Sequence, residues 1–353
     1  MLRRFAVALT TFALGLVVAV APAQAGRKVV VGPGQSIQAA VDAARPGTKI
    51  VVLRGTYREN VTVTKDGIAL IGLGAVLKPP ASPQPSPCSD PENPADVNGF
   101  CVLGDVDLDT GEVSEYVDHV SIRGFTINGF PASGVVAFGA RDASYGRNVA
   151  IDNGEYGFAA FASTGTRMLF NRTSGSGEAG LYVGDSPQAN ATLLGNDTSD
   201  NLFGIFVRNA LHASLVANRA HDNCIGVLVL GDAPGPAGDL KLTANAIRDN
   251  TKACPAEEEE ELPALSGIGV ALSGSTGVTV RGNLITGNVP SGPTERKGGV
   301  VVVSGDAGTP PTDNVIRGNI ILRNEPDLFW DGTGTGNVFA PNACRTSVPD
   351  GLC

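Results

Sequence analysis

The strongest constraint on this chain is a short pattern, an Asn followed five residues later by a second Asn, that returns along most of its length. Complete copies begin at six positions: Asn148, Asn196, Asn218, Asn245, Asn283 and Asn319. Degenerate copies begin at Phe125 and Asn171, so successive starts differ by 23, 23, 25, 22, 27, 38 and 36 residues. Such a period predicts a solenoid, in which each turn of chain contacts only its neighbours. We therefore expect one elongated domain.

The residues between the asparagines favour short strands and tight turns. Gly supplies 46 of the 353 residues, whereas aromatic residues make up 5% and charged residues 17%. Val, Ile and Thr fill the periodic part, and these side chains suit strands. Asn tolerates the left-handed backbone of a sharp turn, and stacked Asn amides can hydrogen-bond from coil to coil. We expect the Asn pairs to be structural corner residues.

Alternation along the strands predicts two faces. The residues five and three before each first Asn should point inward, as Val120 and Ile122 do before Phe125. A second strand follows a recurrent Gly, and the same rule sends an apolar stripe outward: Val136, Ala159, Tyr182, Phe206, Leu228, Ala271 and Val301. An apolar stripe of this length must be covered by loops or used to bind a sugar or a protein.

The first 25 residues have the features of a signal peptide. Arg3 and Arg4 precede an apolar run, and Ala23-Gln24-Ala25 provides small residues for cleavage, so we expect residues 26–353 to be secreted or extracytoplasmic. Removing the two arginines changes the net charge from −9 to −11. That charge argues against nucleic acid or an anionic membrane as partner, and we expect a monomer. It does not exclude an acidic polysaccharide.

Six cysteines in an exported chain most simply form three disulfides. Their order favours local pairs, which are Cys88 with Cys101, Cys224 with Cys254, and Cys344 with Cys353. Sequence alone leaves fifteen pairings open. The first two pairs would close the bases of inserted loops, and the third would hold the C-terminal tail.

Near the start of the mature chain, residues 36–44 are expected to form a helix with Ser36 as N-cap, which would cover the open end of the stack. The stretch from Gly34-Gln35-Ser36-Ile37 through Gly55-Thr56-Tyr57-Arg58-Glu59-Asn60-Val61 resembles the cap and first coil of secreted β-helix proteins of the pectate-lyase-like superfamily. The repeat from Val278 to Asn288 is similar to that family's repeat. The resemblance implies an all-β fold, a single-stranded right-handed parallel β-helix of about ten coils with an N-terminal capping helix.

Three insertions interrupt the period, at residues 79–118, 251–266 and 289–297. The first contains an acidic stretch that should form a hairpin around Asp109-Thr110-Gly111. Its carboxylates, from Asp105, Asp107 and Asp109, could bind calcium through hard oxygen ligands. The spacing departs from a known calcium loop, so an ordinary polar hairpin is the competing interpretation.

One charged cluster is predicted where the outward strands of three consecutive coils end. Its candidate catalytic residues are Tyr182, Asp185, Arg208 and Asp232. In a uronate lyase or epimerase, a cation neutralises the carboxylate, a base such as Tyr or Arg removes a proton, and an acid serves the leaving oxygen. Phe206 of the apolar stripe and His212 are candidate substrate-binding residues. A surface ion pair is the simpler alternative.

The resemblance specifies the fold more closely than the function, because the superfamily includes lyases, hydrolases, epimerases and non-catalytic proteins. Two hypotheses follow. The first is an exported carbohydrate-active protein that binds a polysaccharide and could cleave it by β-elimination or epimerise it. The second is a non-catalytic secreted or cell-envelope module that binds or builds structure.

Overall fold

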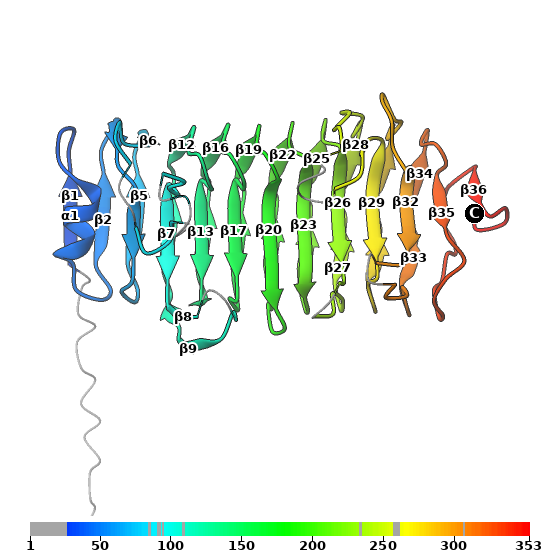
Figure 1. The fold of residues 1–353 in the computed structure, drawn as a ribbon, viewed down its shortest axis with the longest axis horizontal. Coiled ribbons are helices and arrows are strands. Elements are labelled where there is room, and N and C mark those ends of the chain that lie inside the picture. The colour runs from blue at the N-terminus through cyan, green and yellow to red at the C-terminus, as the bar shows by residue number, and fades with distance from the viewer. Residues whose placement is uncertain are drawn as a thin grey trace, which may run out of the picture.

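The computed structural model describes residues 27–83, 86–89, 93, 95–107, 110–232, 235–256, 262–305 and 308–353. The predicted signal peptide, residues 1–25, lies outside these residues. In the described part, nearly all regular structure is strand, arranged in three long sheets that run the length of the molecule (Figure 1). All strand pairs within these three sheets are parallel, so the chain forms the expected parallel β-helix.

Each turn of the helix passes through the three sheets in order. Sheet A contains β1 (Lys28–Val31), β2 (Lys49–Val52), β5 (Ala69–Gly72), β11 (Ser121–Arg123), β15 (Ser144–Gly146), β18 (Arg167–Leu169), β21 (Thr192–Leu194), β24 (Ser214–Val216), β27 (Lys241–Thr243), β30 (Thr279–Arg281) and β33 (Val315–Arg317). Sheet B contains β3 (Gly55–Arg58), β6 (Ala75–Lys78), β12 (Thr126–Asn128), β16 (Val149–Ile151), β19 (Arg172–Ser174), β22 (Asp197–Ser199), β25 (Arg219–His221), β28 (Ala246–Arg248), β31 (Leu284–Thr286) and β34 (Ile320–Leu322).

Sheet C carries the longest strands of the molecule. It contains β4 (Val61–Val63), β7 (Phe100–Leu103), β13 (Val135–Phe138), β17 (Phe158–Phe161), β20 (Ala179–Ser186), β23 (Phe203–Ala210), β26 (Ile225–Leu230), β29 (Ile268–Ser273), β32 (Gly298–Val303), β35 (Leu328–Trp330) and β36 (Ser347–Val348). Two small ribbons complete the described structure, a parallel pair of β10 (Val117–Asp118) with β14 (Ala140–Arg141) and an antiparallel pair of β8 (Asp105–Val106) with β9 (Val113–Glu115).

The interior of the β-helix is the apolar core that the alternation predicted. Val120 and Ile122 are fully buried, and so are their counterparts on later coils, Leu240, Leu242, Val278 and Val280. These residues belong to one continuous cluster that extends from the first coil to the last. Facing side chains from all three sheets fill the interior, so the axis of the solenoid is packed with side chains.

The first asparagines of the repeats form an uninterrupted hydrogen-bond ladder at the corner between sheets A and B. We call it the first ladder, and its members are Asn148, Asn171, Asn196, Asn218, Asn245, Asn283, Asn319 and Asn342. The Oδ1 of each later residue accepts bonds from the backbone N–H and the Nδ2 of the residue one coil earlier, as Asn218 does from Asn196 at 3.0 and 2.9 Å. The ladder therefore satisfies buried polar groups at every coil it crosses.

The second asparagines form a similar ladder between sheets B and C, but with one gap. The second ladder runs through Asn201, Asn223, Asn250, Asn288 and Asn324 and ends on the carboxylate of Asp327. Asn153 lies two coils before Asn201, and Ser176 occupies the coil between them. The Nδ2 of Asn153 is buried and has no hydrogen-bond partner among the described residues. The coil that contains Ser176 therefore lacks the Asn that pairs with its neighbours elsewhere in this ladder.

The recurrent Gly before each outward strand lies against this second ladder. A Cβ built on Gly204 would lie 2.5 Å from the carbonyl oxygen of Gly226 on the next coil and 2.8 Å from Nδ2 of Asn223. Those separations are too short for any side chain, so the close approach of adjacent coils requires Gly here.

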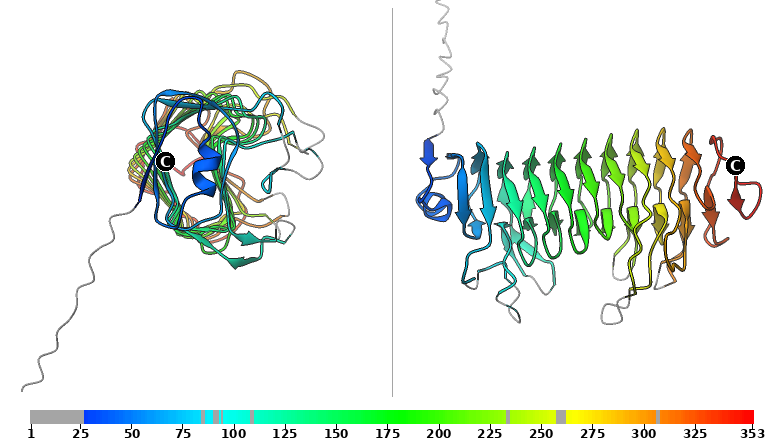
Figure 2. Two further views of the ribbon diagram at one scale, coloured as in Figure 1. Left: turned by 90° about the vertical axis from the view of Figure 1, so that its left-hand side faces the viewer. Right: turned by 90° about the horizontal axis from the view of Figure 1, so that it is seen from above.

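A short helix, α1 (Ile37–Asp42), lies beside the first coil at the N-terminal end (Figures 1 and 2). Ser36 is its N-cap, with the side chain accepting the backbone N–H of Ala39. The helix is shorter than the predicted 36–44 because its last turn tightens, with Ala44 N–H bonded to the Val41 carbonyl three residues earlier. Whether it protects the core as a cap stays a prediction. Within the described ranges, no helix is long and apolar enough to cross a membrane.

The insertions lie at the two ends of the strands of sheet C. Residues 79–99 and 251–266 connect sheet B to sheet C, whereas the β8–β9 hairpin leaves sheet C toward sheet A. Figure 2 shows these segments projecting from the side of sheet C, near its N-terminal end and again farther along the axis. The disulfides Cys88–Cys101, Cys224–Cys254 and Cys344–Cys353 are present, which are the local pairs that the sequence favours.

Candidate functional site

The outward apolar stripe on sheet C is a second buried cluster, separate from the interior core. Its predicted members lie in register across the strands: Val136, Ala159, Tyr182, Phe206, Leu228, Ala271 and Val301. All of them are less than a tenth exposed, with Tyr182 at 1% and Phe206 at 5%. The stripe is therefore covered rather than open.

Different parts of the chain cover the stripe along its length. The disulfide between Cys88 and Cys101 lies at the N-terminal end, and Leu262 and Leu265 of the 251–266 insertion lie toward the C-terminal end. In the middle, Tyr156 and Leu202 from the turns between sheets B and C complete the cover, together with Phe203 at the start of β23. Loops thus provide only part of the cover, and local aromatic residues provide the rest.

Aromatic rings pack against one another along this face. Phe138 and Phe161 are half-buried, with ring centroids 5.1 Å apart and planes 17° from parallel. The Phe161 ring also lies 4.6 Å from Tyr182, which in turn lies 4.7 Å from Tyr156 and 5.2 Å from Phe206. Because the rings cover one another, little ring face remains for a sugar to stack on. Phe206 therefore supports the site through packing in this structure.

At the end of these strands, Arg208 and Asp232 form a two-point ion pair. Nε and Nη2 of Arg208 donate to Oδ2 of Asp232 at 3.2 and 3.0 Å. The Arg208 side chain is 43% exposed and that of Asp232 16%. The Oδ1 of Asn209, the neighbour of Arg208, accepts the backbone N–H of Asp232 at 3.1 Å and so holds the acid in place. Asn209 is a positioning residue that the sequence reasoning missed.

Tyr182 and Asp185 approach this pair from the previous coil. Gly184 pairs in register with Arg208, and its missing side chain leaves the space into which the Tyr182 ring folds. The Tyr182 hydroxyl lies 3.5 Å from Oδ2 of Asp185, a long hydrogen bond. Asp185 itself is exposed and has a left-handed backbone, with φ of 49°. Three consecutive coils thus bring the four predicted residues to one place.

The protonation of these groups follows from burial and charge. Burial and the nearby Asp185 raise the pKa of the Tyr182 hydroxyl. Burial lowers the pKa of the Arg208 guanidinium, but the hydrogen bond and charge of Asp232 outweigh that effect and raise it overall. Tyr182 and Arg208 therefore both hold their protons at neutral pH. Neither group is prepared to act as a base.

Two further carboxylates border the site at the opposite ends of the strands. Glu155 and Glu178 lie on successive coils, since the Glu178 N–H donates to the Glu155 carbonyl at 2.9 Å. Burial raises the pKa of Tyr156, and the charge and hydrogen bond of Glu178 raise it further. Glu178 also acts on Tyr182. Each of the two acids stands two residues before the recurrent Gly of its coil, Gly157 and Gly180, and this shared spacing could have identified the pair.

The remaining predicted site residues lie elsewhere. The His212 ring is exposed, and its Nδ1 lies 3.8 Å from a carboxylate oxygen of Asp239. No contact joins it to Arg208 within the described residues. Its role in binding stays a prediction.

The acidic hairpin forms, with Asp105 opposite Glu115 and Val106 opposite Val113. Oδ1 of Asp107 accepts the backbone N–H of Thr110 at 3.0 Å, so this side chain supports the turn. Asp109 lies outside the described residues. Among the residues that are described, no group of three His, Cys, Asp or Glu side chains is arranged to hold a metal ion.

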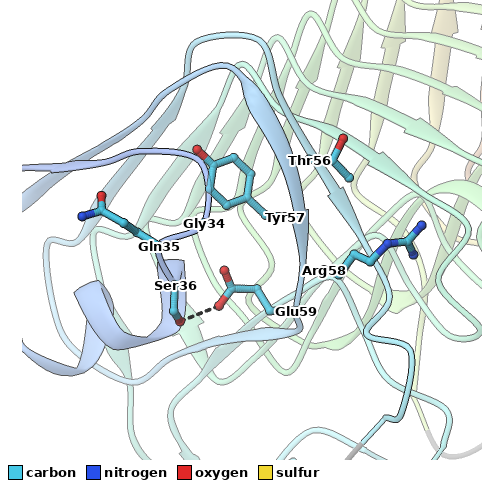
Figure 3. A pocket seen from close by; sticks show the side chains of 7 residues that line it. All are labelled: Gly34, Gln35, Ser36, Thr56, Tyr57, Arg58 and Glu59. Atoms are coloured by element: carbon cyan, nitrogen blue, oxygen red, sulfur yellow. Dashed lines mark hydrogen bonds between the residues drawn. The ribbon is translucent and has the colours of Figure 1, made fainter.

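A pocket of about 370 Å³ lies at the N-terminal end of the molecule, where α1 meets the first coil (Figure 3). The Glu59 carboxylate already occupies the start of the helix, accepting the Ser36 hydroxyl at 2.7 Å and the backbone N–H of Ile37 at 2.7 Å. Two of the polar side chains that line this pocket, Ser36 and Glu59, are thus used to attach the helix. The pocket is far along the axis from the Arg208–Asp232 pair.

Comparisons with known proteins agree with this fold. A family model described as a right-handed β-helix region matches residues 111–321. Among solved structures, the A-module of a mannuronan C-5 epimerase from Azotobacter vinelandii has a TM-score of 0.57 and 18% identity over 88% of both chains. A GH87 α-1,3-glucanase from Streptomyces thermodiastaticus has a TM-score of 0.59 and 14% identity over 93% of this chain and 66% of that one. No curated protein sequence matches significantly.

Proposed function

Because the chain belongs to the right-handed β-helix family, whose model matches residues 111–321, we propose that it binds a polysaccharide on the outer face of sheet C. The observation that carries this proposal is the convergence of Tyr182, Asp185, Arg208 and Asp232 from three consecutive coils. An extended polymer suits a repeating surface, because each coil offers a new set of side chains about 4.8 Å farther along the axis.

The polar groups at this place suit sugar hydroxyls. Asp185 has an exposed carboxylate that can accept hydrogen bonds, and the partly exposed guanidinium of Arg208 retains donors beyond the two given to Asp232. Two of the solved structures that resemble the chain are a mannuronan epimerase and an α-1,3-glucanase. Both names describe enzymes that act on polysaccharides, which supports the choice of ligand class.

Binding is better supported than β-elimination or epimerisation. Both reactions need a base that removes a proton from carbon, and the candidates Tyr182 and Arg208 each have a raised pKa. The burial of Tyr182 also removes it from direct reach of a ligand. The same geometry is compatible with a binding module that lacks catalytic activity.

We further propose that the protein works outside the cytoplasm. Three disulfides are typical of chains that fold in an oxidising compartment. The signal peptide expected at residues 1–25 agrees with export. Sequencing the N-terminus of protein recovered from the culture medium tests this directly, since cleavage should leave Gly26 as the first residue.

The binding proposal is tested by affinity electrophoresis against immobilised neutral and acidic polysaccharides, with ultraviolet detection of unsaturated products in parallel. Arg208→Ala should weaken binding about tenfold, because a charged hydrogen-bonding group is lost. Arg219→Ala is the matched control, since Arg219 is exposed on the outer face of sheet B. Absence of binding across the whole panel would reject the proposal. Unsaturated products that vanish in Arg208→Ala would establish a lyase instead.

A further inference from the structure

One aromatic side chain lies exposed at the corner between sheets A and B. Phe170 stands directly before Asn171 of the first ladder and is 55% exposed. No other aromatic side chain in the described part of the chain is as exposed. Among the described residues, no aromatic ring or guanidinium stacks on Phe170. The surface of this ring is therefore open to a ligand, unlike the rings along sheet C.

The backbone at this corner favours a residue without a bulky side chain. On successive coils the same position holds Gly124, Arg147, Phe170, Gly195, Ala217, Ala244, Gly282 and Gly318, all with a positive φ. Gly adopts this left-handed conformation without strain, whereas a bulky side chain in it is rare. Phe170 nevertheless has a φ of 54°. Backbone strain of this kind is concentrated at binding and catalytic sites, so the aromatic residue here points to a function.

The next coil leaves room for the Phe170 ring. A Cβ built on Gly195 would lie 2.6 Å from both Cδ1 and Cε1 of the ring. Any side chain at position 195 would therefore push the ring away from the corner. Gly195 lets the ring rest against the backbone of the next coil, which supports it there and leaves more than half of its surface open to solvent.

Two exposed arginines border the ring. Arg147 holds the same corner position one coil earlier, and Arg172 follows Phe170 by two residues. Neither arginine forms an ion pair with any of the residues that the structure describes. Asp197 lies opposite Arg172 on the next strand of sheet B, but its Oδ1 lies 3.0 Å from Nε2 of His221. Both guanidinium groups therefore retain hydrogen-bond donors for a ligand.

We propose that this corner, formed by Arg147, Phe170, Arg172 and Gly195, binds carbohydrate, with one sugar ring stacked on Phe170. A pyranose presents C–H groups on its face and oxygen acceptors around its edge. An open aromatic ring suits the first, and guanidinium donors suit the second. The corner joins sheets A and B and is separate from the outer face of sheet C, so binding at one place does not require binding at the other.

Affinity electrophoresis of the whole protein against neutral and acidic polysaccharides tests this site, with Phe170→Ala and Arg208→Ala examined singly and together. Phe170→Ala should weaken binding of at least one polymer about tenfold, with or without the Arg208 substitution. If Phe170→Ala binds every polymer as tightly as the unaltered protein does, the corner site is overturned and the proposal for sheet C stands. If only Phe170→Ala has an effect, the corner site stands and the site on sheet C is rejected. Absence of all binding overturns both.

Leu73→Ala is the matched control. Leu73 is also 55% exposed and lies at the same corner, between β5 and β6, but it has no ring. Its substitution should leave binding unchanged. Equal losses in Leu73→Ala and Phe170→Ala would overturn the assignment to an aromatic platform. Loss of binding to anionic phospholipid vesicles in Phe170→Ala, with polysaccharide binding intact, would assign the corner to a membrane surface instead.

Two further substitutions separate binding from folding. Phe170→Tyr keeps the ring and should retain the affinity. Phe170→Gly should weaken binding about tenfold while the melting temperature stays the same or rises, because Gly relieves the left-handed strain. A melting temperature that falls together with the affinity in Phe170→Gly, and a loss of affinity in Phe170→Tyr, would give Phe170 a structural role only and would overturn the proposal.

Discussion

The corners of the coils and the outer face of sheet C belong to the same repeat, but the corners keep one residue type from coil to coil and the outer face does not. In the first ladder the residue is Asn from Asn148 to Asn342, because each amide must both donate to one coil and accept from another. Along the outer row of sheet C, the residue changes at almost every coil, from Val136 through Tyr182 to Val301. Side-chain packing tolerates such variation, whereas a continuous ladder does not. Function can therefore vary on the outer face while the corners preserve the fold.

The largest expected effect comes from breaking the first ladder. Asn218→Ala removes the acceptor for two bonds from Asn196 and the donors to Leu193 and Asn245, all in a buried setting. Unsatisfied buried groups are costly, so we expect a loss of about 3 to 5 kcal/mol in the free energy of unfolding. Urea denaturation followed by circular dichroism measures it.

The control for this variant is Asn128→Ala. Asn128 lies on β12 with its side chain toward the outside of sheet B and is only half-buried, so its loss should cost less than about 0.5 kcal/mol. Similar losses at positions 128 and 218 would mean that the ladder contributes no more than any other Asn. The contrast between the corners of the coils and the outer face of sheet C would then fail.

This contrast also explains what could be predicted from sequence. The Asn spacing set the register, and from it the inward positions of Val120 and Ile122 and the outward stripe followed correctly. The local part of the cover could not be predicted, because Tyr156 and Leu202 enter it from turns whose path depends on packing between coils. The register predicted that Arg208 approaches Asp232. The two hydrogen bonds that Arg208 donates to Asp232 depend on Asn209, which holds Asp232 in place, and only the three-dimensional arrangement shows that role.

A smaller effect is expected from removing the disulfide that links the second ladder to the 251–266 insertion. Cys224 directly follows Asn223 of the second ladder, and its disulfide to Cys254 spans 30 residues. Replacing both cysteines with Ala should cost about 3 kcal/mol, mainly because the unfolded chain gains freedom. The Cys344–Cys353 pair spans 9 residues, so its removal should cost less. Thermal unfolding of both variants under the same conditions gives the order, and the reverse order would contradict the loop-length argument.

Repairing the gap in the second ladder should have an effect of opposite sign. Ser176→Asn would place an amide between Asn153 and Asn201, giving the unpaired Nδ2 of Asn153 an acceptor. We expect a gain of about 1 kcal/mol, the usual net value of one buried hydrogen bond. Ser176→Ala should instead be neutral or destabilising. A destabilised Ser176→Asn protein would show that Thr173, which lies within 3.3 Å of the Ser176 hydroxyl, prevents the amide from fitting.

The smallest effect at neutral pH, and the one with the clearest pH dependence, concerns two buried tyrosines, one in the interior of the β-helix and one on the outer face of sheet C. Tyr145 points into the core, where its hydroxyl has no hydrogen-bond partner among the described residues, and Tyr182 lies on the outer face beside Asp185. Burial raises the pKa of both hydroxyls.

A raised pKa favours the neutral form in the folded state, so the associated stability is complete below the ordinary Tyr value of about 10 and is lost as pH rises above it. Tyr145→Phe removes an unpaired polar atom and should change stability by less than about 1 kcal/mol at pH 7. The same variant should weaken the fall in melting temperature above pH 10. Tyr182→Phe should also weaken the fall in melting temperature. Because it loses the contact with Asp185, its free energy of unfolding at pH 7 should rise less than that of Tyr145→Phe. If the melting temperature of both variants falls above pH 10 as steeply as that of the unaltered protein, other groups govern unfolding at high pH. Burial of the two hydroxyls would then not be what destabilises the fold there.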